Sequence, residues 1–172
     1  KLKYITTISE KTKQEILQLL PNAENKIKVI PNCLTVETAP LVLDKKNKIP
    51  KIILVGTREN KNVEGTILAI KNVLCFTSFY EGFGLPILEA QARNCAVITS
   101  DISPLKEIAS DSAILVDPYN LDEIRNAVIL LTGNSEFKKK LIQRGKENIT
   151  KYSANKIADL YISYYKDMMK HK

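Results

Sequence analysis

Short runs of apolar, β-branched residues alternate along this chain with longer segments of helical periodicity, and this alternation limits the possible folds more than any other feature. Strands are predicted at residues 4–8, 26–30, 51–55, 73–78, 96–100 and 113–116. Helices are predicted at 9–20, 62–71, 85–94, 120–131, 135–150 and 153–169, with a short helix starting at 103–104. Strands that alternate with helices form parallel sheets covered on both faces, so the sequence predicts an α/β fold.

Polar residues and one proline mark the ends of the predicted helices. Ser9 is placed as an N-cap, and Asn120 with Glu123 three residues later forms a capping-box pattern. Pro86 suits the first position of a helix, where a missing N–H costs no hydrogen bond. Asn94 tolerates the left-handed conformation that often ends a helix.

Composition excludes several classes of protein. Apolar residues make up 44% of the chain, charged residues make up 26%, and no apolar run reaches the roughly 20 residues needed to cross a bilayer. The net charge is +7, but no aromatic residues interleave with Lys138–Lys140, so nucleic acid is not an expected partner. Cys33, Cys75 and Cys95 are isolated, which predicts free thiols in a reducing compartment. The single histidine, His171, disfavours a histidine triad or metal site.

The segment Tyr80–Glu89 combines two glycines with the predicted start of a helix at the end of a strand. Open α/β sheets bind ligands at this position. Gly82 and Gly84 would allow main-chain amides to approach a ligand, and the helix N-terminus adds partial positive charge. Each glycine alone is compatible with a simple turn, but their placement together predicts a phosphate or diphosphate site.

Two carboxylates flank this loop, at Glu81 and Glu89. Eight residues of helix rise about 12 Å, so the two acids are expected roughly 10 Å apart. That spacing is too wide for a retaining glycoside hydrolase and near the upper limit for an inverting one. It suits a ligand with hydroxyls at both ends and a diphosphate between them, which is the layout of a nucleotide sugar. Glu89 alone would also be compatible with a solvated helix residue.

The stretch from Glu81 to Glu89, read as Glu-Gly-Phe-Gly-Leu-Pro-Ile-Leu-Glu, resembles the signature of glycosyltransferase family 4. Val55-Gly56-Thr57 with Lys61-Asn62 resembles the first strand and turn of the family's donor domain. Ile30-Pro31-Asn32 resembles its interdomain linker, and residues 153–169 its C-terminal helix. The resemblance implies a Rossmann-like, doubly wound parallel sheet with helices on both faces, which is one half of a GT-B fold. It also implies a retaining, metal-independent reaction that uses no cofactor.

The resemblance assigns donor-substrate binding to eight residues: Arg58, Lys61, Glu81, Gly82, Phe83, Gly84, Leu85 and Glu89. Glu81 would position the donor sugar, and is the catalytic candidate, while Glu89 would bind the ribose hydroxyls. The amides of residues 82–85 would bind the sugar and the diphosphate, whose charge Lys61 would neutralise. Many family members have an arginine where this chain has Thr57, so Arg58 is the candidate replacement.

Three regions are predicted: the tail of an N-terminal acceptor domain with the interdomain linker at 1–32, the nucleotide-sugar domain at 33–152, and a C-terminal helix at 153–172. Two βα units of the family, roughly 60 residues, are missing between the helix ending near Lys71 and the strand starting at Val73. The alternatives are a genuine deletion or an omitted stretch with the numbering closed up. We favour the second, because a helix that enters a strand across one residue is unusually tight.

The predicted function is that of the donor-binding part of a retaining glycosyltransferase, which passes a mannose-like hexose from a nucleotide diphosphate sugar to a glycan or lipid-linked acceptor. Without the acceptor domain, this chain is expected to be inactive by itself. The alternatives are a non-catalytic nucleotide-sugar-binding module, or another GT-B enzyme such as a nucleotide-sugar epimerase or a phosphorylase. The expected location is the cytoplasm, at the cytoplasmic face of the membrane, with peripheral membrane contact through the missing N-terminal domain.

Overall fold

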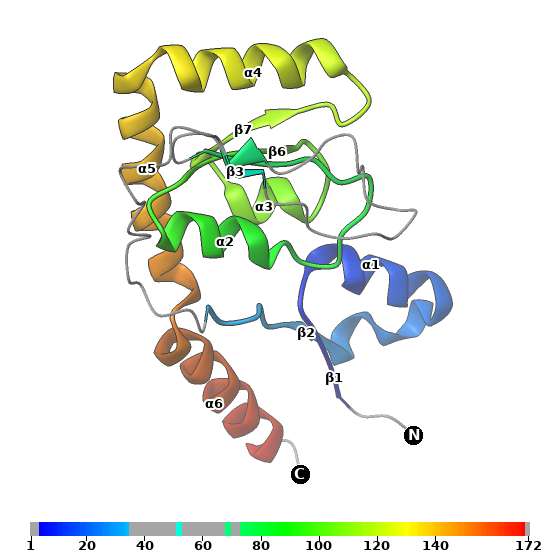
Figure 1. Cartoon of the computed structure of the whole chain (residues 1–172). Coiled ribbons are helices and arrows are strands. Elements are labelled where there is room, and N and C mark those ends of the chain that lie inside the picture. Colours follow the sequence, from blue (N-terminus) through cyan, green and yellow to red (C-terminus); the bar gives the residue numbers. More distant parts are fainter. Residues whose placement is uncertain (1–3, 35–50, 53–67, 70–72, 171–172) are drawn as a thin grey trace.

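Strands and helices in the computed structural model largely follow the predicted alternation (Figure 1). The structure describes residues 4–34, 51–52, 68–69 and 73–170. The strands are β1 (Ile5–Thr7), β2 (Ile27–Val29), β3 (Lys51–Ile52), β4 (Leu68–Ala69), β5 (Val73–Phe76), β6 (Ala96–Ser100) and β7 (Ala113–Val116). The α-helices are α1 (Glu10–Leu19), α2 (Leu85–Ala92), α3 (Leu105–Ala109), α4 (Leu121–Gly133), α5 (Ser135–Ile149) and α6 (Ala154–Lys170). Two 3-10 helices, η1 (Pro21–Lys26) and η2 (Thr150–Tyr152), complete the described elements.

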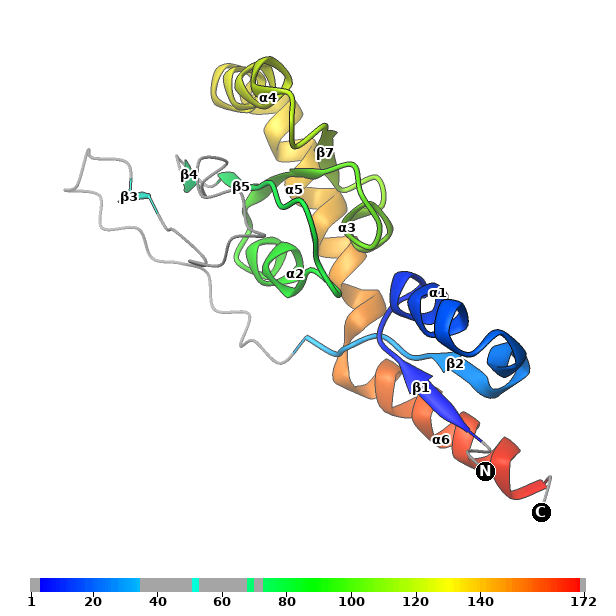
Figure 2. The ribbon, with the colours of Figure 1, turned by 90° about the vertical axis from the view of Figure 1, so that its right-hand side faces the viewer.

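The central sheet is parallel and has the strand order β5-β6-β7. Successive side chains of a strand point to opposite faces, so each face builds its own core. Leu74 and Phe76 of β5 pack with α2 and α3, whereas Val73 and Cys75 pack with α4 and α5. In Figure 2, α4 lies on one side of this sheet and α2 and α3 on the other, while α5 runs from the end of α4 past the sheet to α2. This arrangement confirms the predicted parallel sheet with helices on both faces.

The N-terminal elements form a separate layer, in which β1 pairs in parallel with β2. The C-terminal helix α6 packs against this layer through the Tyr4 and Tyr164 rings, which meet edge to face at 6.3 Å. The backbone N–H of Leu34 donates to the Tyr152 carbonyl at 2.8 Å and ties the segment after β2 to η2. The chain therefore returns at its end to the layer where it began (Figure 2).

The predicted helix caps form in the structure, but the Glu123 carboxylate bonds to groups other than the expected one. Ser9 accepts a hydrogen bond from the Thr12 amide at 3.2 Å, and Asn94 has the left-handed φ of 59° expected of it. The Asn120 side chain accepts from the Asp122 and Glu123 amides, both at 3.2 Å. The Glu123 carboxylate, however, accepts from the Asp117 amide and the Asn120 side chain, not from the Asn120 amide of a regular capping box.

The predicted helix over 62–71 is wrong at its described residues. Leu68–Ala69 form strand β4, which pairs antiparallel with β3. The spacing of Val63, Ile67 and Ile70 satisfies a helical period, but pairing with a distant segment overrides local periodicity. The helix after 84 also ends at Ala92 and not at Asn94. Residues 53–67 and 70–72, which include Arg58 and Lys61, lie outside the described residues. The domain boundaries stay predictions.

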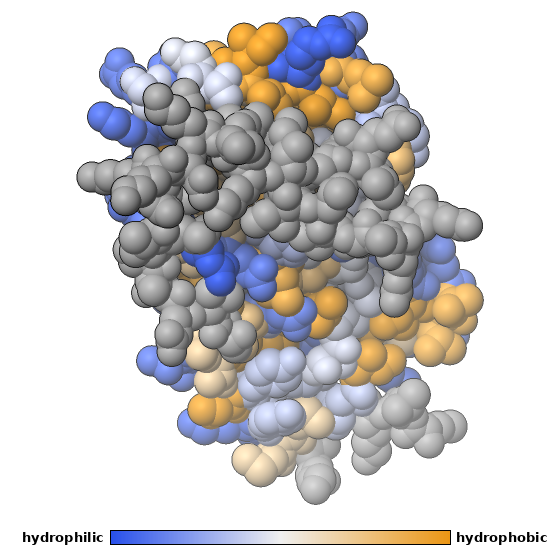
Figure 3. Space-filling view, viewed as in Figure 1, coloured by the Kyte–Doolittle hydropathy of each residue, from blue (hydrophilic) through white to orange (hydrophobic). Residues whose placement is uncertain are grey.

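The other predictions made from composition concern the three cysteines and the absence of a membrane-spanning segment. Cys33, Cys75 and Cys95 are free, as predicted, and burial raises the pKa of Cys75 to about 11. Within the described residues, no helix has the length and apolar character that a bilayer span requires. Apolar side chains gather over α4 (Figure 3), where Leu121 and Ile129 are exposed.

Candidate functional site

The loop between β5 and α2 places Gly84 at the start of the helix in a conformation that favours glycine. Gly84 is the N-cap of α2, with φ 110° and ψ 37°. A Cβ atom there would lie 2.7 Å from Cδ2 of Leu105, a fully buried side chain of α3. A Cβ on Gly82 would meet nothing within 4 Å. Gly84 therefore lets α2 begin close to α3, and Gly82 leaves open space beside the loop.

Main-chain amides at the tip of α2 are the potential ligand-binding groups. The Ile87 amide donates to the Gly84 carbonyl at 3.0 Å, and Pro86, at the second helical position, has no N–H. Among the described residues, no acceptor is recorded for the amides of residues 82–85. Unpaired amides at a helix N-terminus carry partial positive charge and bind anions. The loop can thus hold a phosphate through its backbone.

Phe83 and Leu85 are both predicted to contact the donor substrate, but the exposure of their side chains differs. Phe83 is buried, and its ring meets the Tyr152 ring edge to face at 6.1 Å. Its side chain thus belongs to the core, and only its backbone is left for a ligand. The Leu85 side chain is exposed at the tip of α2.

The two predicted acids are both half-buried but are held differently. The Ser78 hydroxyl donates a hydrogen bond to Oε1 of Glu81 at 3.1 Å. The Glu89 carboxylate has no recorded hydrogen bond or ion pair with another described residue, while its carbonyl accepts from Arg93 at 3.3 Å. Glu81 is therefore oriented by the protein, and Glu89 is available to a ligand. Within the described residues, no group of three His, Cys, Asp or Glu side chains is placed to hold a metal ion.

Tyr80 connects this loop to helix α1. Its hydroxyl donates to the Glu15 carboxylate at 3.2 Å, and Nζ of Lys11 lies 3.3 Å from the centre of its ring. The hydrogen bond to Glu15 raises the pKa of Tyr80, because it favours the protonated phenol. The residue before Glu81 is thus bound to the N-terminal layer. Sequence reasoning missed this contact, since no local pattern joins positions 65 residues apart.

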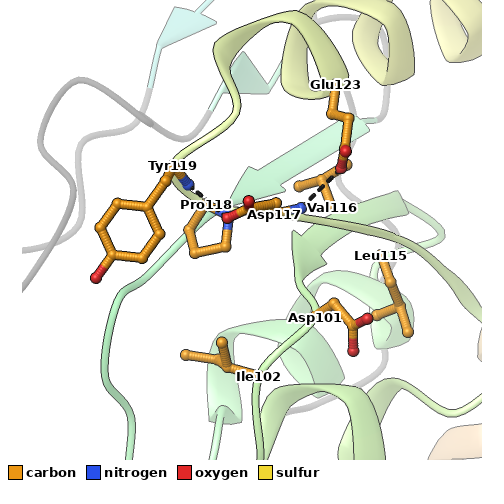
Figure 4. Close-up of a pocket in the computed structure, with 8 residues that line it drawn as sticks. All are labelled: Asp101, Ile102, Leu115, Val116, Asp117, Pro118, Tyr119 and Glu123. Carbon is orange, nitrogen blue, oxygen red and sulfur yellow. Dashed lines mark hydrogen bonds between the residues drawn. The ribbon is translucent and has the colours of Figure 1, made fainter.

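A pocket of about 380 Å³ opens next to the loop, at the carboxyl ends of β6 and β7 (Figure 4). Its lining residues are Asp101, Ile102, Leu115, Val116, Asp117, Pro118, Tyr119 and Glu123. The Tyr119 ring stacks on Phe79 at 4.5 Å, which joins the pocket to the loop after β5. Sequence reasoning missed this pocket, although Asp101 and Asp117 each follow a predicted strand directly and could have indicated it.

Comparison with known proteins defines the class. Residues 38–148 match the family of glycosyl transferases group 1, and the chain belongs to this family. It is 29% identical over 100 residues to O-antigen chain mannosyltransferase B of Escherichia coli, an alignment that covers 58% of this chain and 26% of the relative. It is 33% identical over 86 residues to O-antigen chain mannosyltransferase RfbU of Salmonella typhimurium, which covers 50% of this chain and 23% of the relative. The matched part thus spans about a quarter of each of these relatives.

Solved structures agree on the fold. A glycosyltransferase from Rickettsia africae superposes with a TM-score of 0.73 at 16% identity, over 99% of this chain and 64% of that one. The structure of TarM gives a TM-score of 0.69 at 16% identity, over 94% of this chain and 43% of that one. These neighbours are GT-B glycosyltransferases, and they confirm the predicted fold class. The match over residues 38–148 shows membership of glycosyl transferases group 1, whereas the narrower assignment to family 4 stays a prediction.

Proposed function

We propose that this chain is the donor-binding part of a retaining glycosyltransferase that transfers a hexose, with mannose the first candidate, from a nucleotide diphosphate sugar. The observation that carries the proposal is the set of amides at residues 82–85, which have no recorded partner among the described residues, beside a Glu81 carboxylate held by Ser78. Mannose is suggested by two relatives whose names describe O-antigen chain mannosyltransferases. The acceptor would be a glycan or a lipid-linked glycan.

In the proposed reaction the tip of α2 binds the diphosphate, Glu81 positions the sugar and Glu89 binds the ribose. Lys61, with Arg58 beside it, would add positive charge to the diphosphate. An acceptor hydroxyl oxygen attacks the anomeric carbon on the face from which the diphosphate leaves, so the configuration is retained. The bond from carbon to phosphate oxygen breaks, and the hydroxyl proton passes to that phosphate. Most of the rate enhancement would come from stabilising the leaving diphosphate, with no metal ion or other cofactor.

The remainder of the catalytic cleft would belong to an acceptor domain, of which β1, α1 and β2 form the tail. By this proposal the chain alone binds a nucleotide sugar but does not transfer it. The complete protein would act in the cytoplasm and contact the membrane face through its acceptor domain. A non-catalytic binding module and a nucleotide-sugar epimerase are the competing functions.

Calorimetric titration of the chain with GDP-mannose, GDP, UDP-glucose and UDP tests donor-substrate binding. We expect one nucleotide sugar to bind more tightly than its nucleotide. Glu81→Gln should weaken that sugar-dependent gain by about 10-fold to 100-fold, because hydrogen bonds to a charged group contribute about 1.5–3 kcal/mol. Glu136→Gln, an exposed acid on α5, is the matched control and should change nothing.

The protein that carries both domains should transfer the sugar to an acceptor, and Glu81→Ala should abolish this transfer. If none of the four ligands binds the chain, the proposed function is wrong. Binding without transfer by the two-domain protein would favour the non-catalytic module, and epimerised nucleotide sugar as the product would favour the epimerase.

A further inference from the structure

The end of β5 is joined to the end of β6 by a buried serine hydroxyl. Ser100 is fully buried, and its hydroxyl donates to the Ser78 carbonyl at 2.8 Å while it accepts from the Ser78 amide at 2.9 Å. The last registered pair of these strands is Phe76 with Thr99, so Ser78 lies two residues past it. The Thr99 hydroxyl adds a bond to the Phe76 carbonyl at 2.9 Å. Side-chain hydroxyls therefore extend the connection of the two strands up to the start of the site loop.

Ser78 connects the ends of these strands to Glu81 of the site loop. Its backbone is bonded at both the amide and the carbonyl, its side chain is 1% exposed, and its hydroxyl donates to Glu81 at 3.1 Å. A carboxylate on a surface loop normally samples several rotamers, whereas this one is bonded to a residue that cannot shift without breaking buried hydrogen bonds. A carboxylate can accept about four hydrogen bonds, so the bond from Ser78 leaves capacity for sugar hydroxyls.

We propose that Ser78 and Ser100 are positioning residues that hold the Glu81 carboxylate in the orientation for the donor sugar. This inference rests on the proposed function and adds to it a pair of residues that act through Glu81 without touching the substrate. The pair contributes to the sugar end of the ligand only. A preorganised acceptor gains affinity because the side chain does not have to be ordered on binding.

The test separates the sugar from the nucleotide. The sugar contribution is defined as the Kd of the nucleotide divided by the Kd of its nucleotide sugar, measured by calorimetry for the GDP and GDP-mannose pair and for the UDP and UDP-glucose pair. In the pair that binds, Ser78→Ala should lower the sugar contribution roughly 3-fold to 10-fold, because the Glu81 carboxylate stays in place but its side chain must then be ordered on binding. The Kd of the nucleotide itself should stay within about twofold.

Ser112→Ala is the matched control. Ser112 is 1% exposed and hydrogen-bonded to Gln91 at 2.7 Å, but it precedes β7 and lies at the opposite end of the sheet. This variant should lose stability while it keeps the sugar contribution. In a Glu81→Gln background, Ser78→Ala should cause no further loss, because the group that it orients is already changed.

The outcomes distinguish the two levels of the proposal. If Glu81→Gln lowers the sugar contribution and Ser78→Ala does not, the positioning role is wrong and the proposed function stands. If Ser78→Ala weakens nucleotide and nucleotide sugar equally, its role is structural and the inference is overturned. If Glu81→Gln has no effect, the role given to Glu81 is wrong. Should Ser78→Ala fail to fold, Ser100→Ala replaces it, and an unchanged sugar contribution in that variant also overturns the inference.

Discussion

Gly84 shows how one residue joins the fold to the site. Its φ of 110° is unfavourable for any residue with a Cβ atom, and the space where a Cβ would lie is already occupied by Leu105. Because Gly84 is the N-cap of α2, the direction of the helix tip and of its amides depends on this position. Gly82, two residues earlier, has open space around it and no such restriction.

Gly84→Ala is predicted to destabilise the chain by about 2 to 4 kcal/mol, the sum of a left-handed alanine and overlap with a buried leucine. Gly82→Ala should change the free energy of unfolding by less than about 1 kcal/mol. Urea unfolding followed by circular dichroism measures both values. Equal effects of the two substitutions would contradict this account.

At the scale of elements, α2 is held against α5 by a buried polar cluster at the end far from the site. The Gln91 amide donates to the Ser112 hydroxyl at 2.7 Å and accepts from the Asn148 side chain at 3.1 Å. A Cβ on Gly145 of α5 would lie 2.9 Å from Cγ of Gln91, so the two helices approach as closely as a glycine allows. The packing of α2 on α5 therefore depends on contacts made by its C-terminal half.

Gly145→Ala is predicted to destabilise the chain by about 1 kcal/mol. Overlap with Gln91 costs about 1–3 kcal/mol, and the better helix propensity of alanine offsets up to about 1 kcal/mol of this. Gln91→Ala is destabilising as well, since it breaks two buried hydrogen bonds. The double variant should be less destabilised than the sum of the single variants, because the second change removes the overlap. Additive free energies of unfolding in urea would contradict the predicted contact.

At the scale of the whole molecule, the described residues connect the N-terminal layer to the rest of the chain at several places, among them the Leu34–Tyr152 backbone hydrogen bond. Near the site, Tyr80 contacts Lys11 and Glu15 of α1. At the far end, α6 packs on β1, where the Tyr164 ring meets Tyr4 and its hydroxyl donates to the Ile5 carbonyl at 3.5 Å. The relation between the layers therefore depends on backbone, apolar and side-chain contacts between residues far apart in the sequence.

Tyr164→Ala is predicted to loosen the N-terminal layer and leave the central sheet unchanged. Loss of an aromatic pair, about 0.5–1.5 kcal/mol, should raise the amide hydrogen exchange of β1 and β2 by about 3-fold to 10-fold. Exchange in β5, β6 and β7 should stay the same. Tyr165→Ala is the control, because that side chain is 55% exposed. Faster exchange throughout the chain would show that the two layers unfold together.

Features whose cause lies within a few residues could be predicted from the sequence. The helix starts at Ser9 and Asn120, the left-handed Asn94 and the strand at Ala96–Ser100 all follow from capping chemistry or local pattern. The prediction of a site in the loop with Glu81 has the same basis, since its acids and glycines are close together in the chain. Among the donor-binding candidates that the structure describes, Phe83 is the one whose side chain belongs to the core.

The sequence by itself determined most of the order of strands and helices and the parallel sheet between helices, because these depend on backbone propensities and hydrogen bonds that span one or two turns. The place of the site stays a prediction. Only the tertiary structure decided that Leu68–Ala69 form strand β4 where the sequence predicts a helix, that Ser100 bonds to Ser78, and that Tyr80 contacts α1. These contacts join residues 16 to 65 positions apart. Hydrogen bonds and packing between distant segments stabilise these contacts, and a local sequence pattern contains no information about either.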